Sequence, residues 1–317
     1  MVTVVNVRAQ QARMSGMLGM GMLQLWQFAW SVAVVGAIAS FRSGFCRAFV
    51  LQGKMRTPAA LAQLPGLALL RLEVPKSYWT WFYLVGAMHT TAALLFAVFG
   101  QETQMVQRVL HLIHSRTDPA AGIEEATTAG IRIQPHTIAF LTLFAVHTTR
   151  RFLESVYVTA FGDARMHATI LFVGMYHYLA IVLSVLFDPD SVTPHEDTAL
   201  RRFMQALGGV LFIVATGHQS RCNYLLASQK RANNMQYVIP RGDWFDAVRS
   251  PHYTAEILLY VSFILITGGS TAMLYFASAW VVANQVLLAH ISSQWVDDKF
   301  RDRIDELPKW KLLPYVW

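Results

Sequence analysis

The sequence predicts an all-α integral membrane protein, a bundle of about seven transmembrane helices. Of its 317 residues, 54% are hydrophobic and only 14% are charged, whereas a soluble domain carries about a quarter charged residues. Formal charges are absent from six long windows: 14–41, 77–101, 133–149, 166–187, 203–220 and 257–296. Both observations argue against an ordinary soluble globule. We expect residues 1–317 to form a single membrane domain.

Each uncharged window predicts one membrane crossing, or two in the last case. A hydrocarbon core about 30 Å thick needs roughly 20 apolar residues in helical form. Four windows fit one crossing each: 14–41, 77–101, 166–187 and 203–220. We expect the short window 133–149 to continue as helix through Arg150 and Arg151 to about Val158. Window 257–296 is long enough for two helices, with a break at Gly268-Gly269-Ser270.

The basic residues predict how the helices are oriented. A net charge of +7 would also suit a nucleic-acid-binding protein, but Lys and Arg accumulate in the cytosolic loops of membrane proteins as well. With the N-terminus lumenal and the C-terminus cytosolic, most Lys and Arg residues fall on the cytosolic side, whereas loop 188–200 on the other side is acidic. We therefore expect this topology and no nucleic-acid partner. The first window exceeds a signal-peptide core and predicts a retained helix.

The histidines and cysteines predict no resident metal. The 11 histidines contain no HExxH motif, and Cys46 and Cys222 are isolated on the predicted cytosolic side, where thiols stay reduced. His89 and His177 are interpreted as ordinary hydrogen-bonded helix residues. His290 fits either a site or an interhelical contact.

A first polar cluster lies at the end of the predicted helix 133–158. Helical spacing places His147 beside Arg151, Arg150 beside Glu154, and Glu154 beside Tyr157. Ionisable groups near a membrane are costly, so they require a partner or a function. An ion pair that closes the cytosolic end of the helix and an anion-binding site are both open interpretations.

A second polar cluster spans residues 218–256. Its candidate members are His218, Asn223, Lys230, Arg231, Tyr237, Asp243, His252, Tyr253 and Glu256. Ser250 and Pro251 predict a helix start, with Ser as the N-cap, and such an N-terminus suits a phosphate group. Alone, the segment fits an ordinary basic cytosolic loop. Two such clusters on one membrane face favour a large anionic cofactor. Tyr83 is either an aromatic packing residue or a proton donor to a substrate oxygen.

The order of several short motifs resembles the steroid 5α-reductase family, and most closely its polyprenal reductase branch, over roughly residues 40–317. The motifs are Gly53-Lys54, Val74-Pro75-Lys76-x-Tyr78, Arg150-Arg151-x-x-Glu154-x-x-Tyr157, Gly217-His218-Gln219, Ile239-Pro240-x-Gly242-Asp243-Trp244-Phe245, Ser250-Pro251-x-Tyr253-x-x-Glu256 and Asn284-Gln285. The resemblance implies a seven-helix membrane protein of the endoplasmic reticulum that binds NADPH from the cytosol. It implies reduction of a long-chain polyprenal to dolichal in dolichol synthesis, which supports protein N-glycosylation.

The resemblance also implies roles for individual residues. It places much of the cofactor site in residues 200–317. The cofactor-binding residues that the resemblance implies are Arg151, Asn223, Lys230, Arg231, Tyr237, His252, Tyr253 and Glu256. The two polar clusters add Arg150, Glu154, Tyr157, His218 and Asp243 as expected cofactor-binding residues. The expected proton donor is Tyr83, followed by His147. His290 is a third candidate, because Ser293 stands where polyprenal reductases carry a histidine before the glutamine of the final helix, here Gln294.

Two alternatives belong to other functional classes. A membrane methyltransferase that uses S-adenosylmethionine would share the helical architecture and a similar P-x-Y-x-x-E segment. Its usual R-H-P-x-Y signature is not matched, since Ser250 precedes Pro251. A transporter or lipid-binding protein would distribute basic residues along a path through the membrane, whereas these collect on one face.

Overall fold

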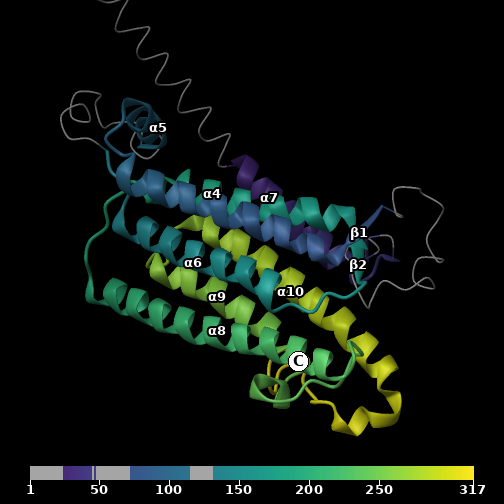
Figure 1. The fold of residues 1–317 in the computed structure, drawn as a ribbon. Coiled ribbons are helices and arrows are strands. Elements are labelled where there is room, and N and C mark those ends of the chain that lie inside the picture. Colours follow the sequence, from purple (N-terminus) through teal and green to yellow (C-terminus); the bar gives the residue numbers. More distant parts are fainter. Residues whose placement is uncertain (1–23, 45, 48–71, 115–130) are drawn as a thin grey trace, which may run out of the picture.

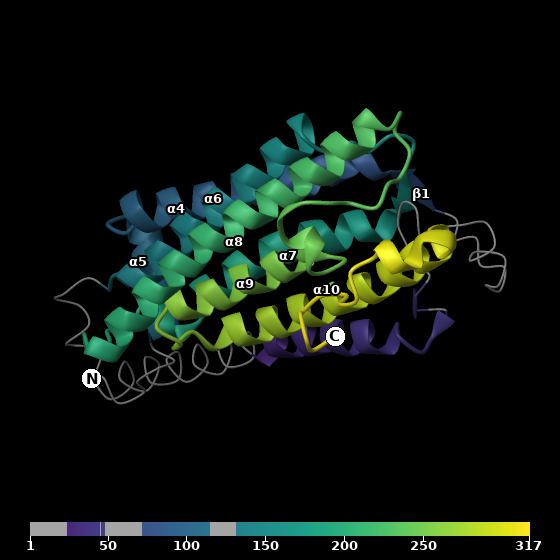
Figure 2. The same cartoon turned by 90° about the horizontal axis from the view of Figure 1, so that it is seen from below.

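The computed structural model describes residues 24–44, 46–47, 72–114 and 131–317, and shows an elongated bundle of helices (Figures 1 and 2). The long helices are α4 (Trp79–Phe99), α6 (Pro135–Tyr157), α7 (Ala168–Leu186), α8 (Ala199–Ala232), α9 (Pro251–Ile266) and α10 (Ala272–Lys299). The short helix α5 (Gln104–His114) lies at one end of the bundle (Figure 1). Helix Gln24–Ala39 packs on the outside, where Trp30 contacts the rings of Tyr176 and His177 on α7.

The helices have the length and surface of a membrane bundle. Four are long and apolar enough to cross a membrane, by length and composition: Lys76–Phe99, Ala168–Leu186, Ala199–Ala232 and Ala272–Lys299. Large apolar side chains such as Phe172 and Ile213 are exposed on their outer faces, which suits contact with lipid. The prediction of a helical membrane bundle is confirmed at this level. The count of seven crossings and the orientation of the ends stay predictions.

Several predicted boundaries are confirmed. Helix α6 continues through Arg150 and Arg151 to Tyr157. The last uncharged window is divided into α9 and α10, and Gly268 and Gly269 in the turn have φ of 68° and 75°. Residues without a side chain adopt such positive φ values readily, which explains why the break falls at this pair.

The predicted start of α9 is confirmed: Ser250 is the N-cap residue and Pro251 begins the helix. The Ser250 side chain makes no capping hydrogen bond. Instead, the Ser250 backbone N–H donates to the Lys311 carbonyl at 3.0 Å, so the C-terminal segment anchors this helix start. The fold is not entirely helical, contrary to the prediction. Strand β1 (Glu73–Pro75) pairs antiparallel with β2 (Arg165–His167) and joins the start of α4 to the start of α7.

The bundle has two chemically different ends. We call the end that carries β1, β2, segment 233–250 and segment 300–317 the tail end. The opposite end carries α5, segment 187–198 and the turn between α9 and α10 (Figure 1). The predicted cytosolic loops that the structure describes therefore gather at the tail end. Residues 14–23 of the first window and the motif Gly53-Lys54 lie outside the described residues.

An aromatic core fixes the helices between these ends. Phe140 and Phe144 of α6 lie against Phe263 of α9, with ring centroids 5.5 Å apart in both pairs. All three side chains are fully buried. Edge-to-face packing of this kind adds to the free energy of burial, and it holds α6 and α9 close together.

Candidate active site

A cavity of about 600 Å³ lies among α4, α6, α7, α8, α9 and α10 toward the tail end. Its polar lining includes Lys76, Tyr83, Arg151, His177, Gln219, Asn223, Lys230, Tyr237, Arg249, His252, Tyr253, Glu256, Asn284 and Gln285. Apolar side chains such as Phe82, Trp280 and Leu288 form other parts of the wall. A cavity of this size, apolar with a limited set of polar groups, is typical of a ligand site.

Glu154 joins the two polar clusters below this cavity. Its Oε1 pairs with Arg150 and accepts a hydrogen bond from Ser220 at 2.7 Å, and its Oε2 pairs with Arg151 and accepts from Asn223 at 2.9 Å. The Arg150–Glu154 pair that the spacing predicted is therefore present. Both carboxylate oxygens already have two partners each. Glu154 therefore holds α6 to α8 and orients the Arg151 and Asn223 side chains.

A second carboxylate, Glu256 of α9, faces the cavity itself. The Gln219 amide links it to α6: its Nε2 donates to Glu256 Oε2, and its Oε1 accepts from Arg150. His147 is fully buried beside this series of hydrogen bonds, and its Nε2 lies 3.7 Å from Glu256 Oε1. Gln219 therefore fixes the direction in which the Glu256 carboxylate meets a ligand.

Tyr83 of α4 also lines the cavity, and it is held by a cation. Arg151 Nη2 donates to the Tyr83 hydroxyl oxygen at 2.8 Å, and the guanidinium lies 4.9 Å from the ring centroid. Because the Tyr83 oxygen is the acceptor in this contact, its own proton stays free to donate to a substrate oxygen. Chemically, this pair is a proton donor next to a fixed positive charge.

The structure places the other candidate donors outside the cavity lining. His147 lies behind Glu256, and its Nδ1 is 3.3 Å from Arg150 Nη2. The ring of His290, on α10, lies against Phe41 and Trp317, at centroid distances of 5.5 and 6.2 Å. Of the three predicted donors, only Tyr83 lines the cavity.

The predicted cofactor-binding residues divide into two groups. Those that line the cavity are Arg151, Asn223, Lys230, Tyr237, His252, Tyr253 and Glu256. Those outside its lining are Arg150, Glu154, Tyr157, His218, Arg231 and Asp243. In this second group, Arg231 donates to the Val158 carbonyl at 2.7 Å, His218 lies 2.7 Å from Asp243, and the Tyr157 side chain is exposed.

Sequence reasoning missed several polar groups in the cavity. His177 Nε2 lies 2.6 Å from the Tyr260 hydroxyl, and its Nδ1 is buried without a hydrogen-bond partner among the described residues. The interpretation of His177 as a hydrogen-bonded helix residue is confirmed by this contact, but its place in the cavity lining was not predicted, because a single histidine in an apolar helix carries no spacing signal. The Gln285 Oε1 is likewise buried and unpartnered within the described part of the chain. Adjacent amides at Asn284-Gln285 in an apolar window are a signal that sequence reasoning had noted without assigning a role.

Four cationic side chains line the same cavity: Lys76, Arg151, Lys230 and Arg249. Lys230 donates to the Ala160 carbonyl at 2.9 Å and lies 5.0 Å from the Tyr237 ring centroid. Burial raises the pKa of the Tyr237 phenol, which therefore remains a neutral hydrogen-bonding group. Excess positive charge near neutral hydrogen-bonding groups suits a ligand with phosphates and polar rings.

Comparison with known proteins shows what this chain resembles. Residues 164–317 match the family model described as 3-oxo-5-alpha-steroid 4-dehydrogenase. This match confirms that residues 164–317 resemble the steroid 5α-reductase family. It gives no support to the methyltransferase alternative.

Over most of its length, the chain is similar to polyprenal reductases. The polyprenal reductase of Xenopus tropicalis is 29% identical over 242 residues, which cover 72% of this chain and 76% of that protein. Polyprenal reductase 1 of Oryza sativa subsp. indica is 26% identical over 85% of this chain and 87% of its own length. Polyprenal reductase 1 of Arabidopsis thaliana is 26% identical over 87% of this chain and 92% of its own length.

Proposed function

We propose that this protein is an NADPH-dependent polyprenal reductase of the endoplasmic reticulum membrane. It reduces the α-isoprene double bond of polyprenal to give dolichal, a step of dolichol synthesis that supports protein N-glycosylation. The observation that carries the proposal is one cavity that combines four cations, buried amides and apolar walls, in a chain similar to polyprenal reductases over most of its length.

The residues present fit NADPH. Its phosphates require cations, which Arg151, Lys230 and Arg249 supply, and its amide and hydroxyl groups require acceptors such as Glu256 and the unpartnered Gln285 Oε1. His252 and Tyr253 lie in the first turn of α9, where the helix dipole also favours an anion. Bound NADPH supplies the hydride that reduces the β-carbon of the enal.

Tyr83 activates the substrate carbonyl. Negative charge collects on the enal oxygen as the β-carbon is reduced, and a correctly placed donor stabilises that charge. The Tyr83 hydroxyl donates its proton to this oxygen, and the enol that forms tautomerises to dolichal, with the oxygen losing a proton and the α-carbon gaining one. Arg151, 2.8 Å from the Tyr83 oxygen, stabilises the negative charge that develops there. The two side chains therefore act as a donor and its electrostatic support.

The polyprenyl tail leaves the cavity through the side of the bundle. Val173 of α7 lines the cavity and is also 47% exposed, next to the exposed Phe172 on the outer surface. Together with Ile170 and Gly174, it forms an apolar edge between the cavity and the region where lipid would lie. A long isoprenoid chain needs such an opening, because it cannot be enclosed in about 600 Å³.

The test uses the full chain purified in detergent, with long-chain polyprenal and NADPH labelled with deuterium at the transferred position. The expected product is dolichal that carries the label on its β-carbon, with one NADPH oxidised per product formed. Mass spectrometry locates the label. Consumption of S-adenosylmethionine with no oxidation of NADPH would contradict the proposal and favour a methyltransferase.

A further inference from the structure

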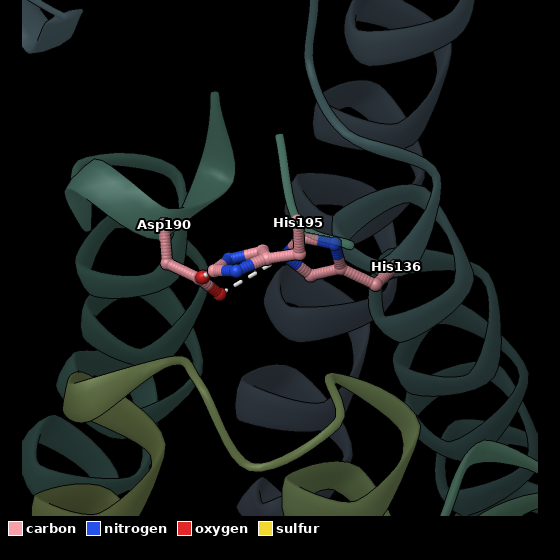
Figure 3. Close-up of side chains that lie close together, drawn as sticks. All are labelled: His136, Asp190 and His195. Carbon is pink, nitrogen blue, oxygen red and sulfur yellow. Dashed lines mark hydrogen bonds and ion pairs between the residues drawn. The ribbon is translucent and has the colours of Figure 1, made fainter. Parts of the chain in front are cut away.

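A compact group of potential metal ligands lies at the opposite end of the bundle from the cavity. His136 is in the first turn of α6, Asp190 is in the short helix η4 (Pro189–Ser191), and His195 is in the segment that leads to α8. Figure 3 shows the three side chains pointing toward one another. None of them lines the cavity at the tail end.

The three side chains meet through their ligating atoms. His136 Nε2 lies 3.0 Å from Asp190 Oδ2, and His195 Nε2 contacts Asp190 Oδ1. All three candidate ligand atoms lie within 4.8 Å of one another, and the two imidazole centroids are 5.5 Å apart. His136 and Asp190 are buried, whereas the His195 side chain is 29% exposed and gives access from solvent.

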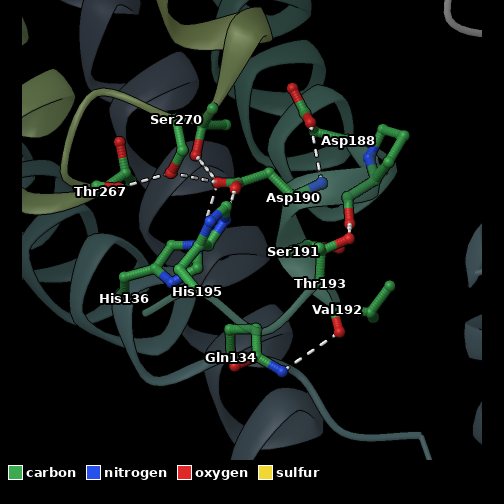
Figure 4. Close-up of polar contacts among 12 residues, drawn as sticks. Gln134, His136, Asp188, Asp190, Ser191, Val192, Thr193, His195, Thr267 and Ser270 are labelled. Carbon is green, nitrogen blue, oxygen red and sulfur yellow. Dashed lines mark hydrogen bonds and ion pairs between the residues drawn. The ribbon is translucent and has the colours of Figure 1, made fainter. Parts of the chain in front are cut away.

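Surrounding groups hold the Asp190 carboxylate in this direction. Ser270, from the turn between α9 and α10, donates to Asp190 Oδ2 at 3.0 Å (Figure 4). Thr271 donates to the same oxygen at 2.6 Å. Asp188 Oδ1 accepts from the Asp190 backbone N–H at 3.1 Å. Hydrogen bonds of this kind commonly orient the ligands of metal sites. The carboxylate is therefore positioned before any ion arrives.

Two imidazole nitrogens and one carboxylate oxygen form a donor set that suits Zn²⁺. Three protein ligands leave a fourth tetrahedral position for water, and the exposed side of His195 provides room for it. With metal–ligand distances of about 2.0–2.2 Å, ligand atoms lie roughly 3.4 Å apart. Small side-chain rotations therefore close the present arrangement around an ion.

We propose that His136, Asp190 and His195 bind one Zn²⁺ ion. The ion would tie the start of α6 to the connection between α7 and α8, and through Ser270 and Thr271 to the turn between α9 and α10. Its place at the opposite end from the cavity gives it a stabilising role, separate from the reduction. The competing interpretation is a metal-free hydrogen-bonded cluster.

The test titrates Zn²⁺ into the full chain, purified in detergent without a histidine tag and treated with a chelator. Calorimetry is expected to give one ion per chain, and Co²⁺ in its place is expected to give the visible spectrum of a tetrahedral site. Loss of one outer hydrogen bond costs about 10–100-fold in metal affinity, so we expect about 10-fold for Ser270→Ala. His136→Asn and His195→Gln remove a ligand and are expected to cost at least about 100-fold.

Two controls separate site loss from unfolding. His195→Gln changes a partly exposed side chain, so this variant should keep the NADPH affinity of the original protein. Glu196→Gln removes a neighbouring exposed charge and should leave Zn²⁺ binding unchanged. Absence of saturable binding, or equal binding by His195→Gln, would overturn the proposal and leave the metal-free cluster. Neither result bears on the reductase activity.

Discussion

At the scale of single residues, the contact between Tyr83 and Arg151 sets the expected chemistry. Arg151 is paired with Glu154 and donates to the Tyr83 oxygen at 2.8 Å, so the cation is fixed next to the proposed proton donor. A preorganised charge of this kind stabilises charge that develops only during the reaction. Loss of the Tyr83 hydroxyl should therefore affect turnover and leave cofactor binding in place.

We expect Tyr83→Phe to lower kcat by about 10²–10⁴-fold, the usual contribution of a general acid. The ring that packs against Phe82 and Tyr178 remains, so NADPH affinity should change little. Product formation by mass spectrometry and NADPH titration measure the two effects separately. Tyr176→Phe is the matched control, because Tyr176 lies on α7 and outside the cavity lining. Turnover of Tyr83→Phe at the original rate would exclude this residue as the acid.

Glu256 is expected to act on the cofactor rather than on the carbonyl. Its carboxylate lines the cavity and is oriented by the Gln219 amide. A hydrogen bond to a charged group contributes about 1.5–3 kcal/mol, so Glu256→Gln should weaken NADPH binding roughly 10–100-fold. Fluorescence titration of NADPH measures this change. Glu306→Gln, an exposed charge in the C-terminal segment, should have no effect, and an unchanged affinity in Glu256→Gln would remove Glu256 from the site.

The residues that sequence reasoning identified are those with local spacing. The Arg150–Glu154 pair followed from positions four apart on one helix, and the structure contains it. The place of His177 in the cavity was not predicted, because its hydrogen-bond partner Tyr260 lies on another helix, 83 residues later. His136 and Asp190 are 54 residues apart, so their contact is produced only by packing of α6 against the connection after α7.

At the scale of secondary structure elements, helix α8 depends on one glycine for its approach to α9. A Cβ added to Gly208 would lie 2.8 Å from the Ile266 backbone nitrogen and 2.9 Å from the Ser262 carbonyl oxygen. Backbone atoms cannot move aside as a flexible side chain does. Small residues permit such close helix contacts in membrane proteins.

We expect Gly208→Ala to destabilise the bundle by about 1–3 kcal/mol, the usual cost of forcing extra atoms into a packed interface. The neighbouring Gly209 provides the control, since a Cβ there meets nothing within 4 Å. Gly209→Ala should be neutral or slightly stabilising, because alanine favours a helix interior over glycine. Thermal unfolding in detergent compares both variants with the original protein. Equal midpoints for the two variants would contradict the proposed contact.

Uncharged windows predicted most helices because a helix that contacts lipid must be apolar along its length. The glycine pair predicted the break because glycine favours turns over helices. The same reasoning could not find β1 and β2, since each strand has three residues and they lie about 90 residues apart in sequence. It placed the N-cap of α9 at Ser250 correctly, but it could not find the contact of the Ser250 backbone N–H with Lys311 of the C-terminal segment. Short strands and contacts with distant segments leave no periodic pattern.

At the scale of the whole molecule, the two ends of the bundle have separate chemistry. The cavity with its four cations lies toward the tail end, and the group of His136, Asp190 and His195 lies at the other. A cytosolic cofactor can reach the cavity only if the tail end faces the cytosol. The charge distribution predicts this orientation, and chemical labelling can test it.

We expect an impermeant maleimide to label Arg303→Cys in sealed microsomes, because Arg303 is exposed in the segment after α10 at the tail end. Glu196→Cys, exposed on the connection between α7 and α8 at the other end, should be labelled only after detergent opens the vesicles. Both variants carry Cys46→Ser, which removes a partly exposed native thiol, while the native Cys222 is buried. The reverse labelling pattern would place the cavity toward the lumen, away from cytosolic NADPH, and would contradict the predicted topology.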